Sequence, residues 1–213
     1  AGPGAGAMAM PQSCGWPCDP GVALTGLVAV TESTAVSFAD AMALTGTWLE
    51  QWESGELSEE VLADRVAELV ASRDGARGFF VVALAGVSPL MDRLPEVLVL
   101  QLRLAGASVV DLSVRNLAMS TAMALAHGRA GDGAQQLGSE RVQARSLALL
   151  QQLDPHLVKA RLEPLLAAAS SADPLDPAPR PAAVEEDLAF LQRWGYDAEQ
   201  RQAIAAALEA VAD

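Results

Sequence analysis

Hydrophobic residues recur at helical spacing along most of the chain. Between residues 34 and 53 the apolar side chains fall at intervals of four, seven and three, which predicts an amphipathic helix: Phe38, Met42, Leu49 and Trp52. A second helix is predicted to begin after Ser58, because serine is a favourable N-cap and glutamates fill the first turn. Gly75 and Gly78 are expected to mark the end of that helix.

Two short apolar runs, Phe79–Val87 and Val97–Leu104, fit either a buried strand or a buried helix. The alanine-rich context favours a helix for both. Pro95 suits the first turn of the second one, with Asp92 or Arg93 near its N-cap.

The next predicted helix, Ala107–His127, is apolar on most sides, which is typical of a central helix in a bundle. The glycines of residues 128–138 predict a loop after it. Ser139 is expected to cap a further helix over residues 140–153, and Asp154 begins another that reaches about Ala169. Pro164 is expected to kink or break that last helix.

The remainder predicts a linker and a helical hairpin. Four prolines in residues 170–183 indicate the linker. Helices over residues 184–194 and 198–212 are expected around a turn at Gly195 and Tyr196. Asp197 and Gln200 have the spacing of a capping box.

The predicted fold class is therefore all-α: a helical bundle of about six or seven helices with a C-terminal helical hairpin. We divide the chain into an irregular arm (1–21), the bundle (22–169), the Pro-rich linker (170–183) and the hairpin (184–213). The first nine residues of the arm are either native or derived from a vector.

Composition agrees with an all-α fold. Of 213 residues, 51% are hydrophobic, only 4% are aromatic and about forty are alanine, a balance that favours helices over sheets. No uninterrupted apolar run of about 18 residues occurs, so no membrane span is expected. The N-terminus lacks the pattern of a signal peptide, and a cytoplasmic location is therefore expected.

The net charge of -13 makes nucleic-acid binding an unfavourable hypothesis, because phosphates would repel the molecule. Acidic residues dominate 50–68 and 173–213, whereas 103–161 is mildly basic. This asymmetry is explained either by solubility or by an anion or acidic partner on the basic middle.

Three polar side chains of the central helix, Asn116, Ser120 and His127, share one stripe, about 60° wide on a helical wheel. They form either a polar ligand pocket or a set of buried groups that bond to neighbouring elements. A second stripe carries the pair formed by Asp111 and Arg115. Near a helix C-terminus, His127 is also suited to the last carbonyls.

Cys14 and Cys18 are the only cysteines, and three residues separate them. Redox pairs use two intervening residues at a helix N-terminus, and a zinc site would need further ligands that are missing locally. They are therefore a weak candidate for a thiol or metal function. No phosphate-binding loop, nucleophile elbow or dinucleotide fingerprint occurs, so no cofactor is expected and no enzyme class is favoured.

Between about Phe79 and Arg145, three segments resemble an uncharacterised helical protein family of cyanobacteria: FFVVALAGVSPL, DLSVRNLAMSTAMALAHGRAGD and GSERVQARSL. Whole segments carry the resemblance, and no diagnostic motif does. It implies a soluble protein of a photosynthetic cell, and it implies no reaction.

The leading functional hypothesis is a non-catalytic protein that acts in interaction, assembly or regulation, with an unidentified protein partner. An oligomer is compatible with this hypothesis. Expected partner contacts are aromatic and arginine side chains: Trp48, Trp52, Arg129, Arg141, Arg145, Trp194 and Tyr196. The alternatives are a ligand site or enzyme at Asn116, Ser120 and His127, and a thiol or metal function of Cys14 and Cys18.

Overall fold

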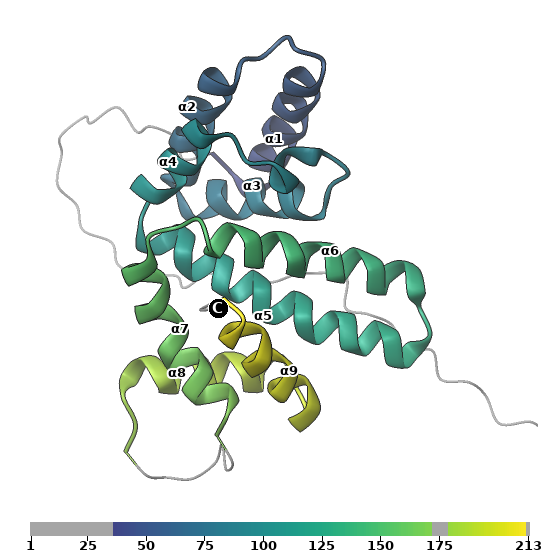
Figure 1. Ribbon diagram of the computed structural model, residues 1–213, viewed down its shortest axis with the longest axis vertical. Coiled ribbons are helices and arrows are strands. Elements are labelled where there is room, and N and C mark those ends of the chain that lie inside the picture. Colours follow the sequence, from purple (N-terminus) through teal and green to yellow (C-terminus); the bar gives the residue numbers. More distant parts are fainter. Residues whose placement is uncertain (1–35, 172–178, 212–213) are drawn as a thin grey trace, which may run out of the picture. The chain divides into compact units, whose positions relative to one another are not determined.

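The protein is described here by a computed structural model that covers residues 36–171 and 179–211. These residues form nine α-helices, one 3-10 helix and no strand, so the expected all-α fold is confirmed (Figure 1). In chain order the elements are α1 (Phe38–Glu53), α2 (Glu59–Val70), α3 (Arg73–Ala85), η1 (Pro89–Asp92), α4 (Glu96–Leu104), α5 (Ala107–Ala130), α6 (Gly133–Leu150), α7 (Pro155–Ala169), α8 (Ala182–Arg193) and α9 (Ala198–Glu209).

Helices α1 to α4 form a compact group in which α3 packs against α1 and α2, and α2 packs against α4. Serines begin the first three helices, because the side chains of Ser37, Ser58 and Ser72 each accept a hydrogen bond from a first-turn N–H. The prediction for Ser58 is confirmed. The expected caps of α4 are wrong: Pro95 itself is the N-cap, and Asp92 ends the 3-10 helix before it.

The expectation that Gly75 and Gly78 end the second helix is also wrong. That helix ends at Val70, and both glycines lie inside α3, which Ser72 caps. The glycines serve close packing. A Cβ on Gly75 would lie 2.0 Å from the Leu69 carbonyl oxygen, and a Cβ on Gly78 would lie 2.5 Å from the Cβ of Ala41.

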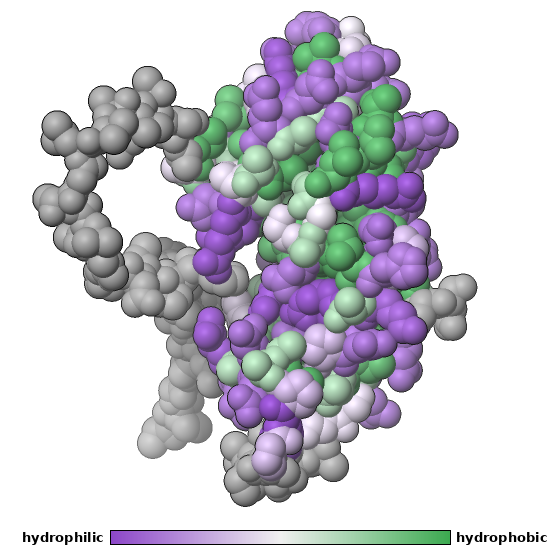
Figure 2. All heavy atoms as spheres, turned by 90° about the vertical axis from the view of Figure 1, so that its left-hand side faces the viewer, coloured by the Kyte–Doolittle hydropathy of each residue, from purple (hydrophilic) through white to green (hydrophobic). Residues whose placement is uncertain are grey.

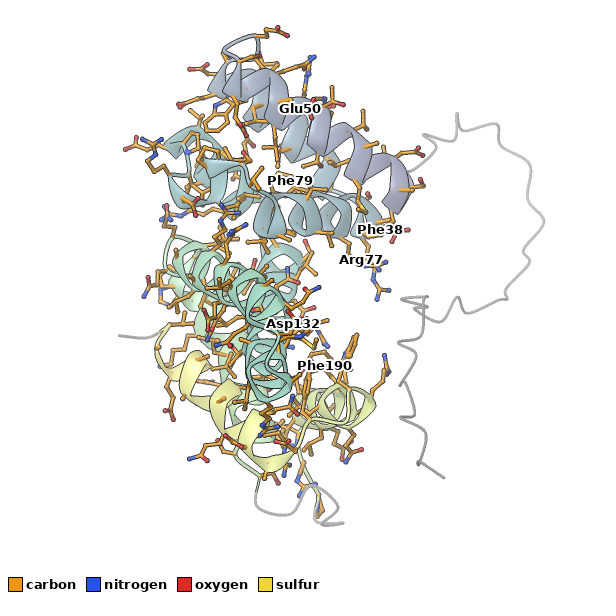
Figure 3. The ribbon with its side chains drawn as sticks, turned by 90° about the vertical axis from the view of Figure 1, so that its right-hand side faces the viewer. Phe38, Glu50, Arg77, Phe79, Asp132 and Phe190 are labelled. Atoms are coloured by element: carbon orange, nitrogen blue, oxygen red, sulfur yellow. The ribbon has the colours of Figure 1, made fainter. Side chains whose placement is uncertain are left out.

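Replacing Gly78 with alanine is expected to destabilise the fold by about 1–2 kcal/mol, because α1 and α3 would have to separate. Phe38 and Arg77, which mark this crossing in Figure 3, would move apart from their 4.8 Å cation–π contact. Gly46 provides the control. It lies inside α1 with open space around it, so Gly46→Ala should raise stability by about 0.5 kcal/mol. Chemical denaturation of both variants measures the difference; equal effects would contradict the close-packing role.

Helices α5 and α6 form a long antiparallel pair (Figure 1). Because α5 also contacts α3, α7 and α9, it is the central helix, as predicted. The loop expected over residues 128–138 and the cap expected at Ser139 are both wrong. Helix α5 continues to Ala130, Gly131 reverses the chain with φ 71°, and the Asp132 side chain caps α6.

The last three helices pack around α5. Helix α8 lies on α7, and α9 lies on α5 and α7. Asp154 caps α7, which continues past Pro164 to Ala169, so the prediction of its start is confirmed. The capping box of Asp197 and Gln200 is present as predicted. Gln200 also donates a hydrogen bond of 3.1 Å to the carbonyl of Ala122, which ties the start of α9 to the central helix.

Candidate functional site

Helix α4 has apolar residues on both its inner and its outer side. Leu98, Val99 and Leu102 are buried in the core. On the outer side, Leu100 is 55% exposed and Leu104 is 72% exposed, and Val97 beside them is partly buried because it also packs against the core. At 100° per residue these three lie within about 60° of each other, so they form one stripe, which we call the α4 face.

The hydropathy of the surface agrees with this placement. The strongly hydrophobic residues visible in Figure 2 gather in its upper half, at the level of α2 and α4 in Figure 1. The inner side of α4 is packed in the core, whereas Leu100 and Leu104 on its outer side stay exposed among the described residues. The exposed leucines of the α4 face do not contribute to the packing of the fold. Among the surface features of the described residues, the α4 face is therefore the clearest candidate for an interaction site.

Two charged residues border the α4 face on one flank. Glu96 in the first turn and Arg103 in the last are seven residues apart, so they lie about 20° apart on the helical wheel and about 10 Å apart along the axis. Within residues 36–171 and 179–211, neither forms an ion pair. Arg103 uses its Nε to donate a hydrogen bond of 2.6 Å to the carbonyl of Gln152, which fixes the side chain at the helix end.

The polar stripe predicted as a ligand site lies on α5. The buried Ser120 hydroxyl donates to the carbonyl of Asn116 at 2.7 Å and to that of Leu117 at 3.1 Å, so it is bonded within its own helix. Asn116 and His127 are partly buried. Because α5 is longer than expected, His127 lies in its last turn and not at its end, and its carbonyl accepts from the N–H of Asp132. The ligand hypothesis stays a prediction.

The second stripe of α5 belongs to a network of two arginines and two aspartates that joins three helices. Arg161 of α7 donates to both oxygens of Asp187 of α8 at 2.7 Å, and its Nε donates to Asp111 of α5 at 2.5 Å. Arg115 binds Asp111 at 3.1 Å, approaches Asp187 at 3.8 Å and lies 4.9 Å from the ring centre of Phe190. Sequence reasoning found the pair on α5 but missed its partners, because they are 50 and more residues away.

Arg145, predicted as a partner contact, is only 5% exposed and holds a turn of the backbone together. Its Nη1 lies 3.2, 3.0 and 2.8 Å from the carbonyl oxygens of Ala83, Leu84 and Gly86. Its Nη2 donates to the Ser88 carbonyl at 2.9 Å, and Nε and Nη2 donate to the Asp92 carboxylate at 2.8 and 2.7 Å. All donors of this side chain are thereby used inside the chain. We call this arrangement the Arg145 clamp.

The other two arginines of the predicted cluster lie at the surface. Arg129, in the last turn of α5, donates to Asp197 at 2.6 Å and to Glu199, so it links α5 to the start of α9. The hydrogen bond from Arg129 and the one from the Gln200 N–H lower the pKa of Asp197. Arg141 is exposed on α6. The structure does not bring the three arginines together as one patch of free cations.

The predicted aromatic contacts are placed differently from one another. Trp48 and Trp52 are partly buried against the core, and the Arg65 guanidinium lies 5.7 Å from the Trp48 ring centre. Tyr196 packs edge-to-face on Phe190, and burial raises the pKa of its hydroxyl, which has no hydrogen-bond partner within the described residues. Trp194, at the end of α8, is exposed.

Cys14 and Cys18 lie outside the described residues, so their predicted thiol or metal function stays a prediction. Among the described residues, no group of three or more metal-ligating side chains comes together. No single described helix is long and apolar enough to cross a membrane, and only α4 and α5 taken together meet the length and composition criteria, with a bend of 107° between them.

The fold and these contacts define an all-α protein whose polar clusters join its own helices. The chain belongs to the family described as Uncharacterised conserved protein UCP020893, whose profile matches residues 37–211. No curated protein and no solved structure matches the chain significantly.

Proposed function

We propose that this protein is a non-catalytic protein-interaction module that binds its partner through the α4 face. The observation that carries the proposal is the exposure of Leu100 and Leu104 on a helix whose inner side is already packed in the core. Fully burying a leucine side chain contributes about 1.5–3 kcal/mol, so covering these two side chains would contribute roughly 1–2 kcal/mol each. A partner that covers the α4 face gains this free energy.

The polar side chains inside the fold support a structural role rather than a catalytic one. The Ser120 hydroxyl is bonded within α5, the Arg145 guanidinium is bonded to α3 and η1, and Asp187 is bonded to Arg161. Groups that take part in catalysis need a donor, an acceptor or a lone pair that faces the substrate. The hydroxyl proton of Ser120, the donors of Arg145 and the carboxylate of Asp187 are engaged inside the chain, which favours binding over chemistry.

A photo-crosslinker placed on the α4 face tests the proposal. Benzoylphenylalanine at position 100 or 104 is expected to give an adduct in a cell extract, because the partner's apolar side chains would lie in contact with it. The resemblance to cyanobacterial proteins makes a cyanobacterial extract the material of choice. The adduct is identified by mass spectrometry, and its intensity is compared with that from the same probe at position 137, since Leu137 is 66% exposed on α6.

Competition completes this experiment. Excess wild-type protein should suppress the adduct, whereas excess Leu100→Ser/Leu104→Ser protein should not. Equal adducts at positions 100, 104 and 137, or no adduct at positions 100 and 104, would contradict an interaction through the α4 face.

A further inference from the structure

We infer that the α4 face binds a second copy of this chain, as an antiparallel pair of α4 helices around a two-fold axis near Leu100. This inference rests on the proposed function and names its partner. It is carried by two properties of the helix, the placement of its apolar residues and the placement of its charges.

The apolar residues of the α4 face are arranged nearly symmetrically about Leu100. Val97 precedes Leu100 by three residues and Leu104 follows it by four. An antiparallel two-fold pair therefore places Leu100 against Leu100, and Leu104 of each copy near Val97 of the other. Such a contact needs no other apolar surface, because the α4 face of each copy covers the α4 face of the other.

The charges complement each other in this orientation only. A two-fold axis between antiparallel helices brings the same flank of both helices together and reverses their ends. Glu96 and Arg103 share one flank and lie at opposite ends of α4, so each Glu96 meets Arg103 of the other copy. A parallel pair would bring like charges to the same level. Gln101, which borders the other side of the α4 face, is uncharged.

The size of the contact sets its strength. A helix of nine residues is about 14 Å long, and an interface built on it is smaller than the roughly 1,600 Å² of a standard complex. The expected dimer is therefore weak and reversible, and it forms at higher protein concentration.

Sedimentation equilibrium of the full chain from about 1 µM to about 1 mM tests the inference. The average mass is expected to rise from 22.1 kDa towards twice that value. Leu100→Ser/Leu104→Ser should weaken association at least about tenfold, which is the effect of losing about 1.4 kcal/mol. Leu137→Ser removes an equally exposed leucine from α6 and should leave association unchanged.

Charge reversal tests the antiparallel geometry. Glu96→Arg and Arg103→Glu should each weaken self-association, because both put like charges opposite each other. The double variant Glu96→Arg/Arg103→Glu should restore it, and so should a mixture of the two single variants. A parallel pair already brings like charges to the same level, so charge reversal at either position or at both should leave its association nearly unchanged. Thermal unfolding at low concentration checks that each variant is folded.

Three results would overturn the inference: a constant mass of 22.1 kDa over the whole concentration range, association that survives the double serine variant, or a charge-swapped variant that does not recover. Failure of the dimer inference can be distinguished from failure of the proposed interaction function. A monomer that still gives an adduct with a different protein at position 100 retains the interaction role, whereas a monomer without any adduct loses both.

Discussion

Replacing Arg145 with alanine is expected to lower the free energy of unfolding by about 3–5 kcal/mol, because several buried backbone carbonyls lose their hydrogen-bond donor at once. The side chain is 5% exposed and supplies the hydrogen bonds of several backbone carbonyls at once. Ala83 and Leu84 lie in the last turn of α3, where carbonyls have no partner within the helix. Without Arg145 these oxygens stay buried and unsatisfied, and each costs roughly 1–3 kcal/mol.

Two control variants separate the clamp from other effects. Arg145→Lys keeps the positive charge but loses the planar fork, so it should remain destabilised by more than about 1 kcal/mol. Arg141→Ala removes an exposed arginine one turn earlier in α6 and should change stability by less than about 0.5 kcal/mol. Urea denaturation measures all three. If the alanine variant at position 145 were as stable as the one at position 141, the clamp would have no energetic role.

The clamp also predicts a dependence on pH. The hydrogen bond from Arg145 lowers the pKa of Asp92, and nearby arginines lower it further. A carboxyl whose folded pKa is lowered stabilises the protein above its unfolded pKa, and that contribution disappears as the pH falls through the folded pKa. The stability difference between wild type and Arg145→Ala should therefore be largest near neutral pH and shrink below about pH 4.

Replacing Asp187 with asparagine is expected to destabilise the protein by about 3 kcal/mol. Asp187 is 1% exposed and accepts two hydrogen bonds of 2.7 Å from Arg161. The substitution keeps the shape of the side chain but leaves two arginines facing the single carboxylate of Asp111. Breaking a buried ion pair on one side is costly because the remaining charge stays buried without compensation.

A double-mutant cycle shows whether the cost arises from the unpaired charge. Arg161→Met removes the main partner, and the double variant Asp187→Asn/Arg161→Met should be less destabilised than the sum of the single variants. Glu186→Ala, at an exposed neighbouring position on α8, serves as the control and should be nearly neutral. Additive effects in the cycle would contradict a coupling between α7 and α8 through this ion pair.

Local chemistry was enough to predict where several helices begin. Ser58, Asp154 and Asp197 cap α2, α7 and α9 as expected, because an N-cap acts on N–H groups only two or three residues away. The helical state of the short runs in α3 and α4 followed from the alanine-rich context. That α5 is central followed from its apolar surface.

The errors at the glycines have one physical cause, which is that packing outweighs weak local propensity. A glycine in a helix costs about 1 kcal/mol relative to alanine, and this penalty is easily offset by tertiary contacts. Gly78 is therefore tolerated inside α3, where it allows α1 to approach. Gly133 and Gly138 are tolerated inside α6, which packs along α5. The sequence alone predicts breaks at these glycines, because their local cost is visible in the sequence whereas their packing partners are not.

The amino-acid sequence predicts the all-α class, the starts of α2, α7 and α9 and the apolar character of α4 and α5, because these depend on neighbours within one or two turns. Which groups meet depends on the tertiary structure. Arg145 reaches carbonyls about 60 residues earlier in the chain, and Arg161 joins Asp111 to Asp187. The tertiary structure also determines which of the two apolar sides of α4 is buried in the core. Both sides are apolar in the sequence, and which one is buried depends on the helices that pack against it.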